Sequence, residues 1–365
     1  MCDTDPMPQE LRRRDLTVLV AVSYALFVLL IVTFDSYPSR VLHGGDNLSY
    51  AAYSAAIRGE HPTALSARHF LGYSLVVAPL AALFGTSDMN ALPVVSILAS
   101  LVAIFLAGEL WGAWVAAWFA VINLDWIQRS LLGGAEPLFV ALIFACLMAA
   151  KRERWTSAAI LASLATVVRP LGLFALMALG IVLLQRRRFG ILAVAVGVGL
   201  VVGGIYLALV AHLSGHSLDN FAWYRSMGLG HDRSFIPFVT IWSSFAAHRL
   251  TAKNVIKTLV WMTFTVAGIS AAFGRAEHRQ RMRACPVQWI FAGLYLASFL
   301  FFPAWWIEGE YPRYLVPVIP ALLVAVEPWL PPNRWVLWTV SLFSVTLAAV
   351  EDMPAFIRAL NGWFR

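Results

Sequence analysis

The chain has 365 residues, of which 60% are hydrophobic and 13% are charged, and its mean hydropathy is +0.73. A water-soluble domain of this size cannot bury so much apolar surface, so we expect lipid to be the solvent for most of the chain. The apolar runs are continuous rather than alternating, which excludes a membrane β-barrel. The formal net charge of +7 is concentrated in short basic clusters beside apolar runs, a pattern that argues against nucleic acid as a partner.

Taken in chain order, the apolar runs predict an all-α polytopic membrane protein with about 11 transmembrane helices. We interpret the first run as a retained anchor, because no small-residue cleavage site follows it. The runs cover residues 17–33, 71–85, 91–109, 111–127, 136–150, 156–169, 171–185, 190–212, 255–273, 285–303, 313–328 and 335–350.

The basic clusters predict which loops face the cytoplasm, because cationic loops resist translocation. This topology places the two longest hydrophilic stretches outside, at residues 34–70 and 213–254. It also makes residues 156–185 an outward-reaching hairpin with Arg169 and Pro170 at its tip. The clusters lie at residues 12–14, 151–154, 186–188 and 275–283.

Four apolar segments lie between residues 70 and 151, although this topology requires an odd number of crossings there. We therefore expect one of them, 71–85 or 111–127, to be a half-helix, re-entrant or fused to its neighbour. The whole chain, residues 1–365, is predicted to be a single integral-membrane domain with surface helices in the first outer loop and no soluble domain. We expect a multi-pass protein of the bacterial inner (plasma) membrane, with its chemistry on the outer side.

The first outer loop contains the stretch "HGGDNLSYAAYSAAIRGEHP", residues 43–62. Written as a helix, it brings Asp46, Tyr50, Tyr53 and Ile57 onto one face, with Asp46 at the N-cap position. One interpretation is a capped surface helix whose tyrosines anchor it at the membrane interface. The other is a carboxylate that acts as a general base beside aromatic rings that stack on a sugar.

Two charged residues lie at the edges of apolar runs. Glu136 in "GGAEPLF" either starts a helix, where the helix dipole favours an anion, or faces a functional cavity. Arg169 in "VVRPLG" carries forked donors that suit a phosphate, and a structural ion pair with Glu136 is the alternative.

Two further candidates are weaker signals. Arg313 in "EGEYPRYLVPVIP" either binds a phosphate, extends to the lipid headgroups, or pairs with Glu308 or Glu310. The dipeptide His231-Asp232 lies between glycine and arginine in the second outer loop, where a mobile segment can cover a ligand. Its alternative is ordinary loop chemistry without a catalytic role.

Four stretches together resemble the GT-C superfamily of integral-membrane glycosyltransferases, which use polyprenyl-phosphate sugars and include mannosyltransferases and aminoarabinose transferases. They are "GGDNLSYAAYSAAIRGE", "GAEPLFVALIFACL", "SLATVVRPLGLFAL" and "YPRYLVPVIPALL", and their order and spacing extend over nearly the whole chain. The resemblance implies a catalytic Asp at Asp46, a second motif acid at Glu136, and motif arginines at Arg169 and Arg313. The chain departs from the pattern at Ala135, where a serine is usual, and has no second acid directly beside Asp46, which leaves open whether a divalent cation is a cofactor.

The resulting hypothesis is an inverting transfer of one sugar, a hexose such as mannose or a pentose, from a polyprenyl-phosphate donor to a lipid, glycan or protein acceptor. Asp46 and Glu136 are the catalytic candidates, Arg169 and Arg313 bind the donor phosphate, and the remaining candidates bind the sugar or acceptor: Tyr50, Tyr53, His231 and Asp232. Three alternatives remain: a transporter or flippase of lipid-linked sugars, a non-enzymatic scaffold of an envelope-polysaccharide assembly, and an oligosaccharide ligase.

Overall fold

The computed structural model describes residues 13–34, 45–60, 69–218, 220, 252–301 and 310–351. Every regular element within these ranges is a helix, which confirms the predicted all-α class. Two compact units interleave along the chain. One contains residues 5–64, 73–141 and 329–365, and we call it the α1–α6 unit; the other contains residues 1–4, 65–72 and 142–328, and we call it the α8–α17 unit.

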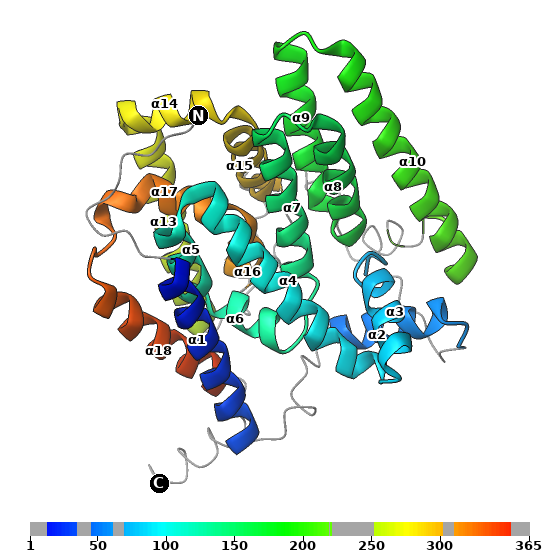
Figure 1. Ribbon diagram of the computed structural model, residues 1–365, viewed down its shortest axis with the longest axis horizontal. Coiled ribbons are helices and arrows are strands. Elements are labelled where there is room, and N and C mark those ends of the chain that lie inside the picture. Colours follow the sequence, from blue (N-terminus) through cyan, green and yellow to red (C-terminus); the bar gives the residue numbers. More distant parts are fainter. Residues whose placement is uncertain are drawn as a thin grey trace. The chain divides into compact units, whose positions relative to one another are not determined.

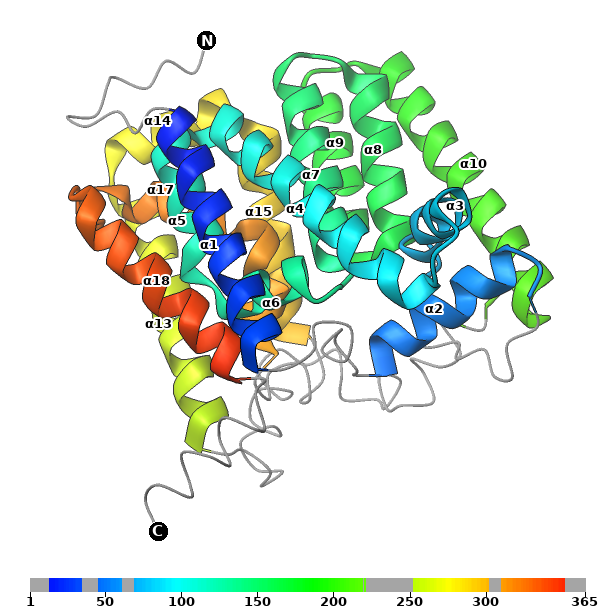
Figure 2. The same cartoon turned by 60° about the horizontal axis from the view of Figure 1, so that its bottom comes forward.

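In the α1–α6 unit, each helix from α2 to α6 packs against the next, while α1 packs against α5 and against α18, the last described helix of the chain (Figure 1). Both views show α18 lying beside α1, and α2 lying with α3 against the beginning of α4 (Figure 2). The helices are α1 (Arg13–Phe34), α2 (Gly45–Ile57), α3 (Ser74–Phe84), α4 (Asp88–Trp111), α5 (Ala113–Ile122), α6 (Leu124–Leu131), the first residues of α7 (Glu136–Lys151), and α18 (Arg334–Glu351).

Buried hydroxyl groups form hydrogen bonds between these helices. Such bonds define the register in which two helices pack, which apolar contacts alone would not do. Ser23 of α1 contacts Ser341 of α18 at 2.6 Å, and Tyr24 donates to Ser100 of α4 at 2.9 Å. Hydrogen bonds between helices matter in lipid because lipid tails are as apolar as leucine and provide no hydrophobic drive for helix association.

The α8–α17 unit holds the predicted outward hairpin and the apolar runs from residue 156 to residue 328. In α8 (Trp155–Val168) the face toward its neighbours is small and fully buried, which allows close helix packing: Ala158, Ala159, Ala162 and Ala165. The other elements are η2 (Pro170–Gly172), α9 (Leu173–Gln185), α10 (Phe189–Ser214), α13 (Ala252–Gly274), α14 (Ala276–Ala284), α15 (Pro286–Ser298), η4 (Phe299–Phe301), α16 (Tyr311–Leu315), η6 (Val316–Val318), α17 (Ile319–Val326) and η7 (Glu327–Trp329).

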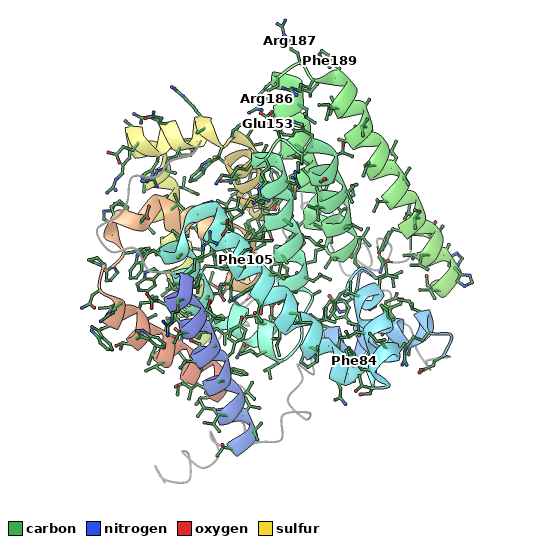
Figure 3. The ribbon with its side chains drawn as sticks, in the orientation of Figure 1. Phe84, Phe105, Glu153, Arg186, Arg187 and Phe189 are labelled. Atoms are coloured by element: carbon green, nitrogen blue, oxygen red, sulfur yellow. The ribbon has the colours of Figure 1, made fainter. Side chains whose placement is uncertain are left out.

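Large apolar side chains project outward from several helices, as expected where lipid covers the protein. Phe84, Phe105 and Phe189 are each more than half exposed (Figure 3). The turn before Phe189 carries exposed charges instead, and Arg186 pairs there with Glu153 at 3.1 Å. This combination of apolar flanks and charged turns is typical of helices that end at a membrane surface.

Among the described residues, four helices are long and apolar enough to cross a membrane, or up to six if each of two bent pairs is one span. They are α1, α4, α10 and residues 254–274 of α13, and the bent pairs are α6 with α7 and α14 with α15. The chain is therefore an integral multi-pass membrane protein, while the count of about 11 crossings stays a prediction.

Both segments that were candidates for an incomplete crossing in the first half of the chain form short helices. Predicted segment 71–85 forms an 11-residue helix, α3, which extends only about 16 Å at 1.5 Å per residue. Predicted segment 111–127 is not one helix, because Gly112, at φ +95°, separates α4 from α5, and Asn123 precedes a new helix, α6. None of these helices alone crosses about 30 Å of hydrocarbon. Leaving out both segments would again give an even number of crossings, so the structure does not single out one of them.

Candidate functional site

Asp46 lies in the first turn of α2, not at its N-cap position, because the helix begins one residue earlier, at Gly45. The predicted N-cap role is therefore wrong. The carboxylate is 6% exposed, and in the first turn it lies near the positive end of the helix dipole, which favours an anion. The far end of α2 is fixed to α4, because Arg58 pairs with Asp88 at 2.6 Å and Ser54 donates to the same carboxylate.

Tyr50 and Tyr53 share a face with Asp46, as the helical spacing predicted, but this face lies in the protein interior. The two tyrosines are 3% and 1% exposed, and the ring of Tyr50 meets that of Tyr73 edge-on at 5.0 Å between centroids. Because α3 and α4 pack against α2, both rings are enclosed by protein, which is inconsistent with a role as anchors at the membrane interface. Their role in binding a sugar stays a prediction.

Glu136 is the first residue of α7, and Pro137 follows it in the first turn, where a proline costs no helical hydrogen bond. The carboxylate is 3% exposed. The predicted helix start is confirmed. The alternative, that Glu136 faces a functional cavity, stays a prediction, and the carboxylate again lies at the positive end of a helix.

Arg129 is a site residue that sequence reasoning missed. Its helix, α6, begins where the Asn123 side chain accepts a hydrogen bond from the backbone N–H of Trp126, and Gln128 fastens it to α18 by donating to the carbonyl of Ala348 at 3.0 Å. Residues 124–127 of the stretch "LDWIQRSL" belong to the predicted apolar run 111–127, and Arg129 falls between that run and the next. The available signal was the arginine itself, placed among apolar residues seven positions before a candidate acid.

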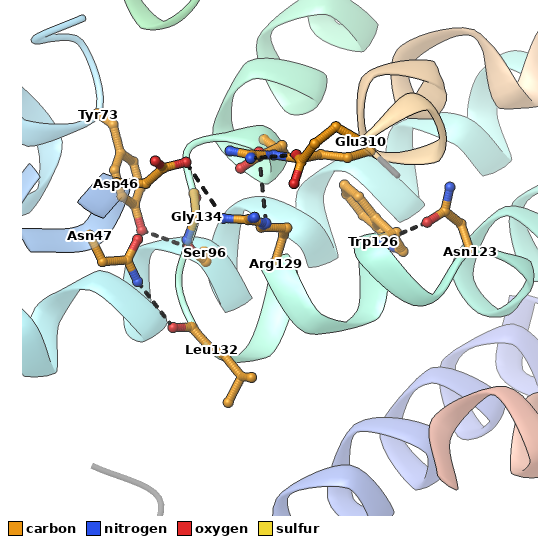
Figure 4. A network of polar contacts seen from close by, with 12 residues as sticks. Asp46, Asn47, Tyr73, Ser96, Asn123, Trp126, Arg129, Leu132, Gly134 and Glu310 are labelled. Carbon is orange, nitrogen blue, oxygen red and sulfur yellow. Dashed lines mark hydrogen bonds and ion pairs between the residues drawn. The ribbon is translucent and has the colours of Figure 1, made fainter. Parts of the chain in front are cut away.

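The guanidinium of Arg129 lies near both carboxylates. Its Nη1 is 3.9 Å from Oδ2 of Asp46, and its Nε is 3.9 Å from Oε1 of Glu136 (Figure 4). These distances exceed those of direct hydrogen bonds, so Arg129 supplies positive charge to both acids without tightly occupying their oxygens. We call Asp46, Arg129 and Glu136 the Arg129 centre.

Arg169 lies at the hairpin tip, between α8 and η2, as predicted. Backbone packing holds the tip. A Cβ on Gly172 would lie 2.4 Å from the backbone nitrogen of Thr166, and one on Gly72 would lie 2.6 Å from that of Val168. Gly72 also donates to the carbonyl of Val167 at 3.2 Å. The residues just before Arg169 are therefore enclosed on two sides by glycine backbone.

Arg313 is 7% exposed in α16, so it does not extend to lipid headgroups, and that alternative is wrong. The predicted pairing with Glu310 is confirmed at 2.7 Å. The guanidinium carbons of Arg313 and Arg169 each lie 5.5 Å from the centroid of the Tyr314 ring. We call Arg169, Arg313, Tyr314 and Glu310 the Tyr314 cluster.

The two groups differ in what they can bind. The Tyr314 cluster offers two guanidinium groups and one carboxylate, an excess of positive charge that suits a phosphate. In the Arg129 centre two carboxylates share one guanidinium, an excess of negative charge. Among the described residues, no group of three or more His, Cys, Asp or Glu side chains is placed to hold a metal.

Three residues named in the predictions lie outside the described residues: His231, Asp232 and Glu308. The pairing of Glu136 with Arg169 joins residues of different units and stays a prediction.

No protein-family model matches the sequence, and neither does any curated protein sequence. Among solved structures, the chain is similar to ArnT from Cupriavidus metallidurans bound to undecaprenyl phosphate, with a TM-score of 0.55 and 18% identity over 90% of this chain. The apo state of that ArnT gives a TM-score of 0.47, with 18% identity over 89% of this chain and 62% of that one. An apo oligosaccharyltransferase from Archaeoglobus fulgidus gives 0.48, with 13% identity over 95% of this chain and 55% of that one.

The chain spans 62% of the length of the undecaprenyl phosphate-bound ArnT. At 18% identity the similarity concerns the fold and not the activity. It agrees with the resemblance inferred from the four sequence stretches. The protein thus shares the fold of the undecaprenyl phosphate-bound ArnT over most of its own length.

Proposed function

We propose that this protein is an inverting membrane glycosyltransferase that moves one sugar from a polyprenyl-phosphate donor to a hydroxyl acceptor. The observation that carries the proposal is the Arg129 centre: two buried carboxylates from distant parts of the sequence, each in the first turn of a helix, within 3.9 Å of one guanidinium. The fold shared with ArnT, whose structure was solved with undecaprenyl phosphate, supports the choice of donor.

In the proposed reaction, Asp46 takes the proton of the acceptor hydroxyl as its oxygen bonds to the anomeric carbon. The bond from that carbon to the phosphate oxygen breaks on the opposite side, and the lipid phosphate leaves with the electron pair. Arg169 and Arg313 stabilise the charge that gathers on the leaving phosphate. Arg129, which lies between Glu136 and Asp46, orients the Asp46 carboxylate.

The proposal extends to finer points that the sequence suggested. The sugar is a hexose or pentose, the acceptor is a lipid, a glycan or a protein, and transfer takes place at the non-cytoplasmic face of a bacterial inner membrane. A polyprenyl-phosphate sugar presents its headgroup at the bilayer surface, which accounts for an enzyme whose carboxylates belong to membrane-associated helices.

The test is label transfer by the purified full chain in lipid nanodiscs, using radiolabelled undecaprenyl phosphate mannose, the corresponding glucose and arabinose donors, and a panel of lipid, glycan and peptide acceptors. Asp46→Asn is expected to lower kcat by about 10²- to 10⁴-fold, the usual contribution of a general base. Asp88→Asn is the matched control, because Asp88 is also a buried acid in the first turn of a helix of the same unit and pairs with an arginine. It is expected to change kcat by a few-fold at most.

Wild-type turnover by Asp46→Asn would remove Asp46 as the base. Movement of the labelled donor across acceptor-free proteoliposomes, without transfer in any acceptor mixture, would replace the transferase with a transporter.

A further inference from the structure

The turn between α6 and α7 sets the position of Glu136. The two helices meet at an angle of 104°, and residues 132–135 make the connection. Leu132 and Ala135 are completely buried, and Gly133 has a φ of +93°, which favours glycine. Because Glu136 is the first residue after this turn, a small displacement of the turn moves its carboxylate directly.

Gly134 lies directly against the two charged side chains of the site. A Cβ at this position would be 2.8 Å from Oε2 of Glu136 and 3.0 Å from Cδ of Arg129. The backbone of the turn therefore packs against both Glu136 and Arg129, and its location limits how close the two can approach.

Ser96 of α4 holds this glycine from one side. Its hydroxyl is fully buried, accepts a hydrogen bond from the N–H of Gly134 at 2.9 Å, and lies 2.9 Å from the Gly134 carbonyl, to which it can donate (Figure 4). The hydroxyl of Tyr73 lies 2.6 Å from that of Ser96 and 2.7 Å from the carbonyl of Leu92. A single serine thus serves both backbone groups of Gly134.

Asn47 holds the turn from the other side. Its side-chain amide donates to the carbonyl of Leu132 at 3.4 Å, and a Cβ on Gly133 would lie 3.0 Å from the same nitrogen. Asn47 follows Asp46 directly in α2. The same turn therefore contacts the residue beside one carboxylate and leads into the helix that carries the other.

We propose that Ser96 and Asn47 are positioning residues that hold the 132–135 turn and thereby set the placement of Glu136 relative to Asp46 and Arg129. This inference rests on the proposed function, because it assumes that the carboxylates take part in transfer. Neither residue touches the reacting atoms, so each acts on the rate through the geometry of the Arg129 centre.

The test compares Ser96→Ala with Ser100→Ala in the same transfer assay with undecaprenyl phosphate mannose, or whichever of the three donors the wild type uses. Ser100 is also buried, lies one turn further along α4, and bonds to Tyr24 and to the carbonyl of Ile97 instead of to the turn. Both variants are expected to lose similar thermal stability. Ser96→Ala alone is expected to lower kcat at least tenfold at unchanged donor KM, because a misplacement of about 1 Å can cost on the order of 10²-fold.

A loss of folded protein would also lower the apparent kcat, so rates are normalised to the monodisperse folded fraction and the pH profile is measured. Displacement of Glu136 is expected to shift the acidic limb of the kcat profile in Ser96→Ala and not in Ser100→Ala. If Ser96→Ala does not fold, Asn47→Ala carries the same comparison.

Equal kcat values and equal pH profiles in the Ser96 and Ser100 variants would overturn the inference while Asp46→Asn stays inactive. Full activity of Asp46→Asn would instead overturn the proposed function, and the positioning role with it.

Discussion

The Arg129 centre and the Tyr314 cluster use the same residue types in opposite proportions. The first has two carboxylates and one guanidinium, and the second has two guanidinium groups and one carboxylate. Their contacts also differ: Arg129 stays 3.9 Å from each acid, whereas Arg313 bonds to Glu310 at 2.7 Å.

This difference in charge indicates which part of the proposed transfer reaction each group suits. A net negative group with loosely paired carboxylates can take up a proton, whereas a net positive group beside an aromatic ring can hold an anion. Each group belongs to one unit, so the comparison can be tested on each separately.

Removal of the Arg129 guanidinium is expected to have the largest effect on activity. Arg129→Met removes the guanidinium that lies 3.9 Å from each of two buried carboxylates, and the loss of one partner of a buried ion pair costs about 3–5 kcal/mol. We expect kcat to fall by about 10²-fold or more, and Arg129→Lys to recover part of it. Arg58→Met is the control, because Arg58 pairs with Asp88 and Glu60 in the same unit. Equal losses of normalised kcat in the Arg129 and Arg58 variants would contradict a special role for Arg129.

The affinity for undecaprenyl phosphate, measured without an acceptor, tests the Tyr314 cluster separately. Arg169→Met and Arg313→Met each remove a charge-assisted contact worth about 1.5–3 kcal/mol, so Kd should rise by about 10- to 100-fold. Asp46→Asn should bind as the wild type does. Arg186→Met is the control, because Arg186 also lies over an aromatic ring, Trp155, and pairs with an acid. Kd can be measured by microscale thermophoresis, and an unchanged Kd in both variants would exclude the Tyr314 cluster as the phosphate site.

The smallest expected effect is on the pH dependence of stability. It concerns α14 of the α8–α17 unit, where basic residues lie around the buried His278. Burial lowers the pKa of His278 below its ordinary value of 6.5, and the charges of Arg281 and Arg275 lower it further, against Glu277 and Glu327. The unfolded chain therefore takes up a proton near pH 6.5 that the folded protein resists, so stability falls as the pH drops below 6.5.

The unfolding temperature of the wild type should accordingly decrease more steeply than that of His278→Gln between pH 7 and pH 5, while both bind undecaprenyl phosphate equally at pH 7.5. Parallel curves would show that His278 does not contribute to the pH dependence.

The sequence revealed isolated charges in apolar surroundings more readily than the partners of those charges. Glu136, Arg169 and Arg313 stood out because a charge at the edge of a membrane helix is costly unless it is paired or functional. The hairpin tip at Arg169 followed from the basic clusters on either side of it. Arg129 was not predicted as a site residue. Its contact with Glu136 depends on the 104° angle between α6 and α7, which no local sequence pattern indicates.

The helical period correctly grouped Asp46 with Tyr50 and Tyr53, but it gives no information on whether a face meets protein or solvent. That depends on Tyr73 of the next segment and on the contact of Asp88 with Ser54 and Arg58. The sequence also did not reveal that one apolar run of suitable composition, residues 111–127, is interrupted at Gly112 and Asn123.

The backbone of Gly72 and Gly172 against the last turn of α8 has a consequence for selectivity among lipids. In the proposed function, the backbone that carries Arg169 has little freedom to lose when a lipid phosphate arrives, so ordering this tip adds little to the entropic penalty of binding. Carriers that differ only in the number of isoprene units should consequently compete on nearly equal terms for the arginine, and discrimination between them must come from surfaces that touch the hydrocarbon tail.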